Sequence, residues 1–215
     1  MLVKGRMSSP VITIDENTPV MEALDMMRKK NIRRTPVLDK SGNMVGIVSD
    51  KDLLNAGPSD ATSLSVWEIN YLLSRLVVKE VMTRDVLTIQ VDTPIEEAAY
   101  VMANNKIGGL PVLDNGQLVG LITETDLFKV FLELMGAQDA GVRVTAVVAE
   151  KPGELDVITH AIAEGGGNFV SLGVFSGSDE TNKVVTFKVT GMTEADVLAK
   201  VRPHVVEITD IRDCC

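Results

Sequence analysis

The sequence predicts an α/β protein in which two copies of one small unit are followed by a domain with a different pattern. The first observation behind this prediction is an internal repeat that aligns Met7 with Met82. The second is the composition, since 45% of the residues are hydrophobic and only 4% are aromatic. Such aliphatic cores suit strands covered by helices, which appear as short apolar runs. The third is a change of pattern from Gly141 onward.

The internal repeat keeps its register through most of each copy. One turn residue is missing from the second copy, and the match continues beyond that point. Chance does not maintain such a register. The matching segments are Met7–Ile14 with Met82–Ile89, Pro36–Asp39 with Pro111–Asp114, and Val45–Ser49 with Val119–Thr123.

Each copy is predicted to contain the same elements. Thr18 and Thr93 are good helix N-caps, each followed by Pro, and Glu96 would complete a capping box in the second copy. A strand, a polar turn, a second strand and a final helix follow. Since one unit cannot cover its own apolar face, we expect the two to pack as one module. The predicted strands are Thr35–Leu38 and Met44–Val48, repeated as Leu110–Leu113 and Leu118–Ile122, and the final helices begin near Asp50 and Glu124.

The stretch between the copies predicts a linker. Gly57–Ser63 is rich in turn-forming residues, and Leu64–Leu76 has apolar residues at helical spacing. We interpret the second stretch, which holds the single tryptophan, Trp67, as a packed linker helix. The alternative is that this helix also gates a ligand cleft.

A hydroxyl residue and an aspartate recur at the end of the second strand in both copies. Ser49 and Asp52 in the first copy match Thr123 and Asp126 in the second. Helix N-termini attract anions, so a hydroxyl there can bind phosphate, and an aspartate can accept from ribose hydroxyls. A plain capping box is the alternative for one occurrence, and the two roles are compatible. Because the motif occurs twice at the same place, we favour a nucleotide site.

The two copies differ just before the first strand. Arg33 and Arg34 precede this strand in the first copy, and they could neutralise phosphate or belong to a solvated turn. The second copy has Gly108 and Gly109 instead, which permit close backbone approach without charge. The two sites should therefore differ in anion preference.

The duplicated pattern resembles a CBS-domain pair, also called a Bateman module. The resemblance implies that adenosine compounds such as AMP, ADP, ATP, NAD or S-adenosylmethionine bind between the repeats. It implies that the aspartates hold ribose, the hydroxyls and arginines approach phosphate, and the valines border adenine. The implied nucleotide contacts are Val11, Arg33, Arg34, Ser49, Asp52, Val86, Gly109, Thr123 and Asp126.

The C-terminal pattern predicts a βαββαβ order, and hence a ferredoxin-like sandwich with an antiparallel sheet. Lys151–Leu155 and Gly167–Phe169 resemble an ACT domain. Many ACT domains bind amino acids between paired copies, which makes Gly153, Glu154 and Asn168 candidate contacts. The alternative is that the domain only dimerises. The predicted strands are Val142–Ala149, Asn168–Phe175, Lys183–Thr190 and Val205–Thr209, with helices Glu154–Glu164 and Thr193–Val201.

The whole chain resembles the acetoin-utilisation AcuB-type family, in which a CBS pair precedes an ACT domain. We predict a first CBS repeat over 1–57, a linker helix over 58–78, a second repeat over 79–136 and an ACT-like domain over 141–215. The resemblance implies a homodimer and a regulated protein that the sequence does not identify.

Composition and motifs exclude several classes of function. The formal net charge of −9 disfavours nucleic-acid binding, and no apolar stretch is long enough to span a membrane. The cysteines, Cys214 and Cys215, cannot staple the fold, and we expect a cytoplasmic protein. No arrangement typical of catalysis or metal binding occurs, so we predict a ligand sensor without catalytic or metal-ligating residues. A scaffold with vestigial sites and a nucleotide-processing enzyme are the alternatives.

Overall fold

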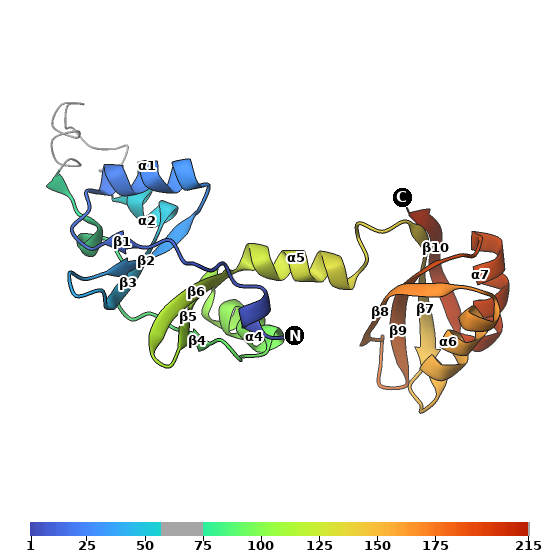
Figure 1. Cartoon of the computed structure of the whole chain (residues 1–215). Coiled ribbons are helices and arrows are strands. Elements are labelled where there is room, and N and C mark those ends of the chain that lie inside the picture. Colours follow the sequence, from blue (N-terminus) through green and yellow to red (C-terminus); the bar gives the residue numbers. More distant parts are fainter. Residues whose placement is uncertain (57–74, 215) are drawn as a thin grey trace, which may run out of the picture. The chain divides into compact units, whose positions relative to one another are not determined.

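The computed structural model describes residues 1–56 and 75–214, and the chain divides into two compact units, Met1–Leu127 and Phe128–Cys215 (Figure 1). Most of the predicted linker helix over 58–78, including Trp67, lies outside the described residues.

In its described residues, the first unit contains two three-stranded sheets, one for each copy of the repeat. In both sheets the first strand pairs parallel with the second, and the second pairs antiparallel with the third. The helices and the second and third strands of each copy lie where the repeat predicts them, whereas the short first strands, β1 and β4, were not predicted. The first copy contains β1 (Ile14–Asp15), α1 (Val20–Lys30), β2 (Arg34–Leu38), β3 (Met44–Ser49) and α2 (Asp50–Asn55), and the second contains β4 (Ile89–Gln90), α4 (Ile95–Asn105), β5 (Gly109–Asp114), β6 (Gln117–Thr123) and the start of α5 (Glu124–Leu134).

The predicted caps of the first helix in each copy are wrong. The N-cap of α1 is Pro19 rather than Thr18, and that of α4 is Pro94 rather than Thr93. Both prolines are extended, with ψ of 139° and 142°, and neither helix has a side-chain cap. The capping box predicted for Glu96 is therefore not formed.

The physical reason is that another segment of the chain caps these helices. The Val20 N–H donates to the Leu76 carbonyl at 2.9 Å, and the Ile95 N–H donates to the Met1 carbonyl at 3.0 Å. The first amide of a helix has no partner within the helix, and here a backbone carbonyl from a distant segment supplies one. A side-chain cap is therefore not needed at that amide.

The segment that precedes the first strand of each copy binds to the other copy. The 3-10 helix η1 (Val3–Gly5) lies against the second copy, where the Val3 N–H donates to the Thr93 carbonyl at 2.9 Å. Further along, Ser8 and Leu121 exchange backbone hydrogen bonds of 2.9 and 3.2 Å. The N-terminal segment of the chain is thus part of the second half of the module.

The segment before the second copy makes the matching contacts with the first. The Val78 N–H in η2 (Val78–Glu80) donates to the Thr18 carbonyl at 2.9 Å, and Thr83 and Ile47 exchange two backbone bonds of 2.9 Å. Val78 and Met82 are buried in the core of the first copy. Each half of the module is therefore completed by the segment that precedes the other.

Two strand glycines allow this crossing. A methyl group on Gly46 would lie 2.6 Å from the Met82 sulfur and 2.8 Å from the Thr83 carbonyl oxygen. At the equivalent position, a methyl group on Gly120 would overlap the Met7 side chain. The crossing segments lie so close to the strands that a side chain has no room at these two positions.

The second unit has the βαββαβ order that the sequence predicts. Its antiparallel sheet has the order β10-β7-β9-β8, and α6 and α7 pack on one face (Figure 1). The last strand starts later and runs further than predicted. The elements are β7 (Gly141–Ala149), α6 (Glu154–Glu164), β8 (Asn168–Ser176), β9 (Asn182–Thr190), α7 (Glu194–Val201), η3 (Arg202–His204) and β10 (Glu207–Cys214).

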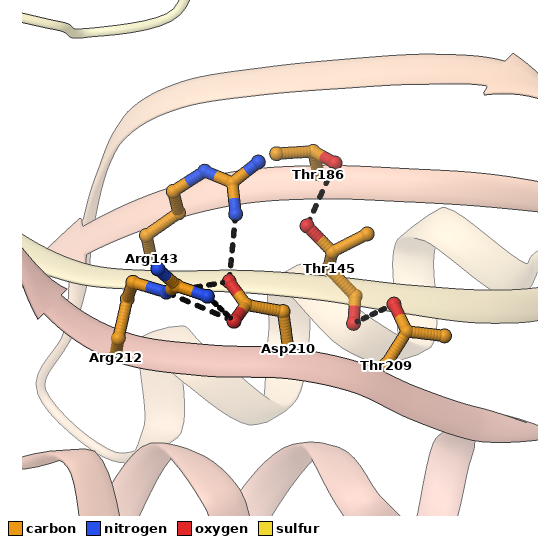
Figure 2. Close-up of polar contacts among 6 residues, drawn as sticks. All are labelled: Arg143, Thr145, Thr186, Thr209, Asp210 and Arg212. Atoms are coloured by element: carbon orange, nitrogen blue, oxygen red, sulfur yellow. Dashed lines mark hydrogen bonds and ion pairs between the residues drawn. The ribbon is translucent and has the colours of Figure 1, made fainter.

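The other face of this sheet carries a cluster of polar side chains from β7, β9 and β10 (Figure 2). The guanidinium of Arg143 donates to Asp210 at 2.8 Å, and Arg212 Nε donates to the same carboxylate at 2.9 and 3.0 Å. These bonds, those from Arg212 above all, lower the pKa of Asp210. The hydroxyls of Thr145 and Thr186 are 3.1 Å apart. Alternation of a core face and a polar face is typical of an antiparallel sheet covered on one side.

A buried lysine holds the residues that precede β7. Lys188 is only 4% exposed, and its ammonium donates to the carbonyls of Gly136 at 2.7 Å and Asp139 at 2.8 Å. The Ser171 hydroxyl donates to the Met135 carbonyl at 3.2 Å. These bonds satisfy a buried charge and fasten the connection after α5 to the sheet.

Among the described residues, no helix is long and apolar enough to cross a membrane. Cys214 is a free thiol at the end of β10, and Cys215 lies outside the described residues.

The contacts around Gly46 and Gly120 predict that a methyl group added at these two positions destabilises the protein to different extents. We expect Gly46→Ala to lower the free energy of unfolding by about 1–3 kcal/mol, because a backbone carbonyl cannot move aside easily. Gly120→Ala should cost less, since only the flexible Met7 side chain must move. Gly5→Ala is the control, because a methyl group there has nothing within 4 Å. Urea denaturation measures all three, and equal stabilities for the first two variants would contradict this account.

Candidate ligand-binding cleft between the repeats

A cavity of about 430 Å³ lies between the two copies in the first unit. This volume is within the range of small-molecule sites. The first copy contributes the segment before β1 and the end of α1, and the second contributes the end of β6 and the start of α5. The lining residues are Ser8, Pro10, Val11, Ile12, Asn31, Ile32, Arg33, Arg34, Leu121, Thr123, Thr125 and Asp126.

Five of the predicted nucleotide contacts line this cavity, namely Val11, Arg33, Arg34, Thr123 and Asp126. They come from opposite ends of the repeat, and from both copies. The structure therefore brings together an apolar side chain, two guanidinium groups, a hydroxyl and a carboxylate.

The apolar wall of the cavity is held by a buried hydroxyl. Thr35 on β2 is fully buried, and its Oγ1 donates to the Ile12 carbonyl at 2.5 Å. The Ser9 hydroxyl donates to the Val119 carbonyl at 3.0 Å on the other copy. These bonds fix the segment that contains Val11. The sequence prediction did not include Thr35, although a threonine among apolar strand residues is a signal for such a bond.

The hydroxyl and the aspartate of the repeated motif bind each other. In the second copy, the backbone N–H of Thr123 donates to Asp126 Oδ2 at 3.0 Å, and the Thr123 hydroxyl donates to the same oxygen at 2.7 Å. Ser49 and Asp52 make the same bonds at 2.8 and 2.6 Å, and they form a capping box on α2. The capping interpretation is thus confirmed for α2, and the second copy makes the two matching bonds to its aspartate. These bonds also fix the Asp126 carboxylate beside the cavity.

The two arginines cross from the first copy to the second. Arg33 donates to the Thr125 hydroxyl at 3.0 Å, and Arg34 donates to the Gly108 carbonyl. Burial lowers the pKa of Arg34, whereas the nearby Glu124 carboxylate acts in the opposite direction. Arg34 is therefore a partly desolvated cation in the wall of the cavity rather than part of a solvated turn.

Four predicted nucleotide contacts do not line this cavity. Three of them lie on the other side of the module, where Thr83 pairs with Ile47. By the repeat, Ser49, Asp52 and Val86 are the equivalents of Thr123, Asp126 and Val11. Gly109 is buried, and a methyl group on it would lie 2.8 Å from Cδ of Arg34. The first copy's arginine thus occupies the space that a side chain of the second copy would need.

Two of the three candidate amino-acid contacts lie together in the second unit. Gly153 and Glu154 line a cavity of about 400 Å³ at the start of α6. Gly153 has φ of 94°, which suits glycine in the turn before a helix, and Glu154 forms an ion pair of 3.0 Å with Lys151. Asn168 follows the other end of α6, and it is not among the lining residues.

Comparison with known proteins gives consistent matches to one family. The sequence profile of the CBS domain matches residues 3–59 and 78–133, together more than half of the chain. A CBS domain-containing protein of Dictyostelium discoideum is 35% identical over 136 residues, which cover 63% of this chain and 94% of that protein. L-aspartate semialdehyde sulfurtransferase of Methanocaldococcus jannaschii is 32% identical over 131 residues, which are 60% of this chain but only 23% of the enzyme.

Solved structures show the same likeness. The CBS domain pair of protein MJ0100, crystallised with 5′-methylthioadenosine and S-adenosyl-L-methionine, is 31% identical with a TM-score of 0.52, and the match covers 65% of this chain and 98% of that chain. A putative acetoin utilization protein (AcuB) from Vibrio cholerae is 29% identical with a TM-score of 0.53, over 65% of this chain and 96% of that chain.

The cavity wall provides a test of the Thr35 bond. We expect Thr35→Val to lower the free energy of unfolding by about 1–2 kcal/mol, because it removes the donor to the Ile12 carbonyl while preserving the shape of the side chain. Thr83→Val, at an exposed threonine, is the matched control and should change little. Chemical denaturation measures both variants. Equal stability of Thr35→Val and the unmodified chain would show that the bond does not hold the wall.

Proposed function

The chain belongs to the CBS-domain family, and on that premise we propose that it is a regulatory protein that senses an adenosine compound. The ligand binds in the cavity between the two repeats, and its presence is signalled to another protein. The observation that carries this proposal is that Val11, Arg33, Arg34, Thr123 and Asp126 line one cavity, although they come from both repeats.

Each of these groups suits one part of an adenosine ligand. The apolar wall at Val11 suits a base, and the Asp126 carboxylate suits the ribose hydroxyls. The Thr123 hydroxyl lies at the start of α5, where the helix dipole favours an anion, and the two guanidinium groups suit phosphate. AMP, ADP, ATP, NAD and S-adenosylmethionine are the candidate ligands. The adenosine compounds crystallised with the MJ0100 pair support this class.

The equivalent residues on the other side of the module are a second candidate location. Ser49, Asp52, Val86 and Gly109 hold the places of Thr123, Asp126, Val11 and Arg34 there. The equivalent backbone pairing of Thr83 with Ile47 supports this assignment.

For the second unit, we propose an ACT-type role in dimerisation or amino-acid sensing. Its βαββαβ order and the cavity beside Gly153 and Glu154 support this role. Asn168 lies beyond the other end of α6 from Gly153, and we propose that a site that includes it forms between two copies of the chain. We place the protein in the cytoplasm as a homodimer, and the likeness to the Vibrio cholerae protein favours a role connected with acetoin utilisation.

A non-binding scaffold or dimerisation protein with vestigial sites, and an enzyme that acts on a nucleotide, are the rival functions. The scaffold predicts no affinity for any of the candidate ligands, whereas the enzyme predicts turnover of a bound nucleotide. The match covers only 23% of the sulfurtransferase, so most of that enzyme has no counterpart in the match. This likeness therefore gives little support to an enzymatic function.

Calorimetric titration of the full chain tests the sensor proposal. We expect at least one of AMP, ATP, NAD and S-adenosylmethionine to bind, and Asp126→Ala to weaken that binding about tenfold or more, because a charge-assisted hydrogen bond is lost. Asp25→Ala, at an exposed aspartate on α1, is the control and should bind normally. If no ligand binds the unmodified chain, it is not an adenosine sensor. Unchanged affinity in Asp126→Ala would place the site elsewhere.

A further inference from the structure

Arg34 lines the cavity, and its guanidinium and the carboxylate of Glu124 both lie near Gly108. On the basis of the proposed function, we propose that the Glu124 carboxylate competes with the phosphate of the ligand for the Arg34 guanidinium. Glu124 thereby sets how much more tightly the cavity binds a phosphorylated adenosine compound than adenosine itself. Glu124 is the first residue of α5, between Thr123 and Thr125, which both line the cavity.

The packing around Gly108 brings the two charges together. A methyl group on Gly108 would overlap Nη2 of Arg34 and would lie 2.6 Å from Oε2 of Glu124. Both groups therefore lie against the same small patch of backbone. The Gly108 carbonyl accepts from Arg34 and also from the Glu124 N–H, the latter at 3.1 Å. The second copy has glycine here, and this is why the first copy's arginine can reach the start of α5.

Other charges near Arg34 are less important than Glu124. Asp50 and Asp52 also favour the charged guanidinium, but to a smaller extent, and Arg33 opposes it. Arg33 is exposed, and it donates to the Thr125 hydroxyl. A phosphate near Thr123 would meet one cation bound to a neutral hydroxyl and one that lies near a carboxylate.

This arrangement has a specific consequence for affinity. A phosphate that binds Arg34 must share it with Glu124, and the two negative charges repel each other at close range. The ribose and the base carry no charge, so this repulsion does not affect them. Glu124 should thus lower the affinity for AMP selectively, and leave that for adenosine unchanged.

The test compares AMP with adenosine by calorimetric titration of the full chain. We expect Glu124→Gln to bind AMP about threefold to tenfold more tightly and adenosine as before. Glu96→Gln, an exposed glutamate in the first turn of α4, is the matched control and should change neither affinity. Arg34→Ala should weaken AMP binding about tenfold, and adding Glu124→Gln to it should restore little, because the effect acts through Arg34.

The outcomes separate this proposal from the proposed function. If AMP and adenosine bind but Glu124→Gln leaves AMP affinity unchanged, or raises both affinities equally, competition for Arg34 is wrong while the sensor proposal stands. If neither compound binds the unmodified chain, both proposals fail. Glu124→Ala provides a second variant, and a thermal melt of each variant confirms that the fold is intact.

Discussion

Backbone hydrogen bonds exchanged between the two repeats hold the first unit together. Ser8 pairs with Leu121, and Thr83 pairs with Ile47, so the segment before the first strand of each repeat is bound to the last strand of the other. This exchange caps the first helix of each copy through backbone carbonyls and completes the core with Val78 and Met82. Neither copy can therefore be complete without the segment that precedes its partner, and the pair folds as one body.

The same exchange creates the cavity. It places the segment around Val11 against the end of β6, where the capping bonds of Thr123 and Asp126 hold a hydroxyl and a carboxylate in place. The two sides of the module then differ because arginine stands in one copy and glycine in the other. Arg34 extends over the backbone at Gly108 and reaches the start of α5, so one side chain links the strand of the first copy to the site formed by the second.

Local patterns predicted most of the elements, whereas contacts between distant segments could not be predicted. The βαββαβ order, the repeated strands and the helix starts at Asp50 and Glu124 follow from periodicity and turn residues, and the structure confirms them. The caps at Thr18 and Thr93 were wrong because a carbonyl from a remote segment satisfies the helix amide, which local sequence does not encode. The contact of the Arg34 side chain with the backbone of Gly108 was not predicted either, because it also joins distant segments of the chain. The sequence analysis expected close backbone approach at the glycines, but it did not predict that the arginine of the other copy is the group that approaches.

Groups from both repeats are proposed to form one adenosine site, and a crystal structure of the full chain grown with AMP would show whether they do. We expect the base against the wall at Val11, the ribose at Asp126, and the phosphate between Thr123 and the arginines. Density for AMP in the second unit, or at a surface formed by one repeat alone, would contradict this proposal.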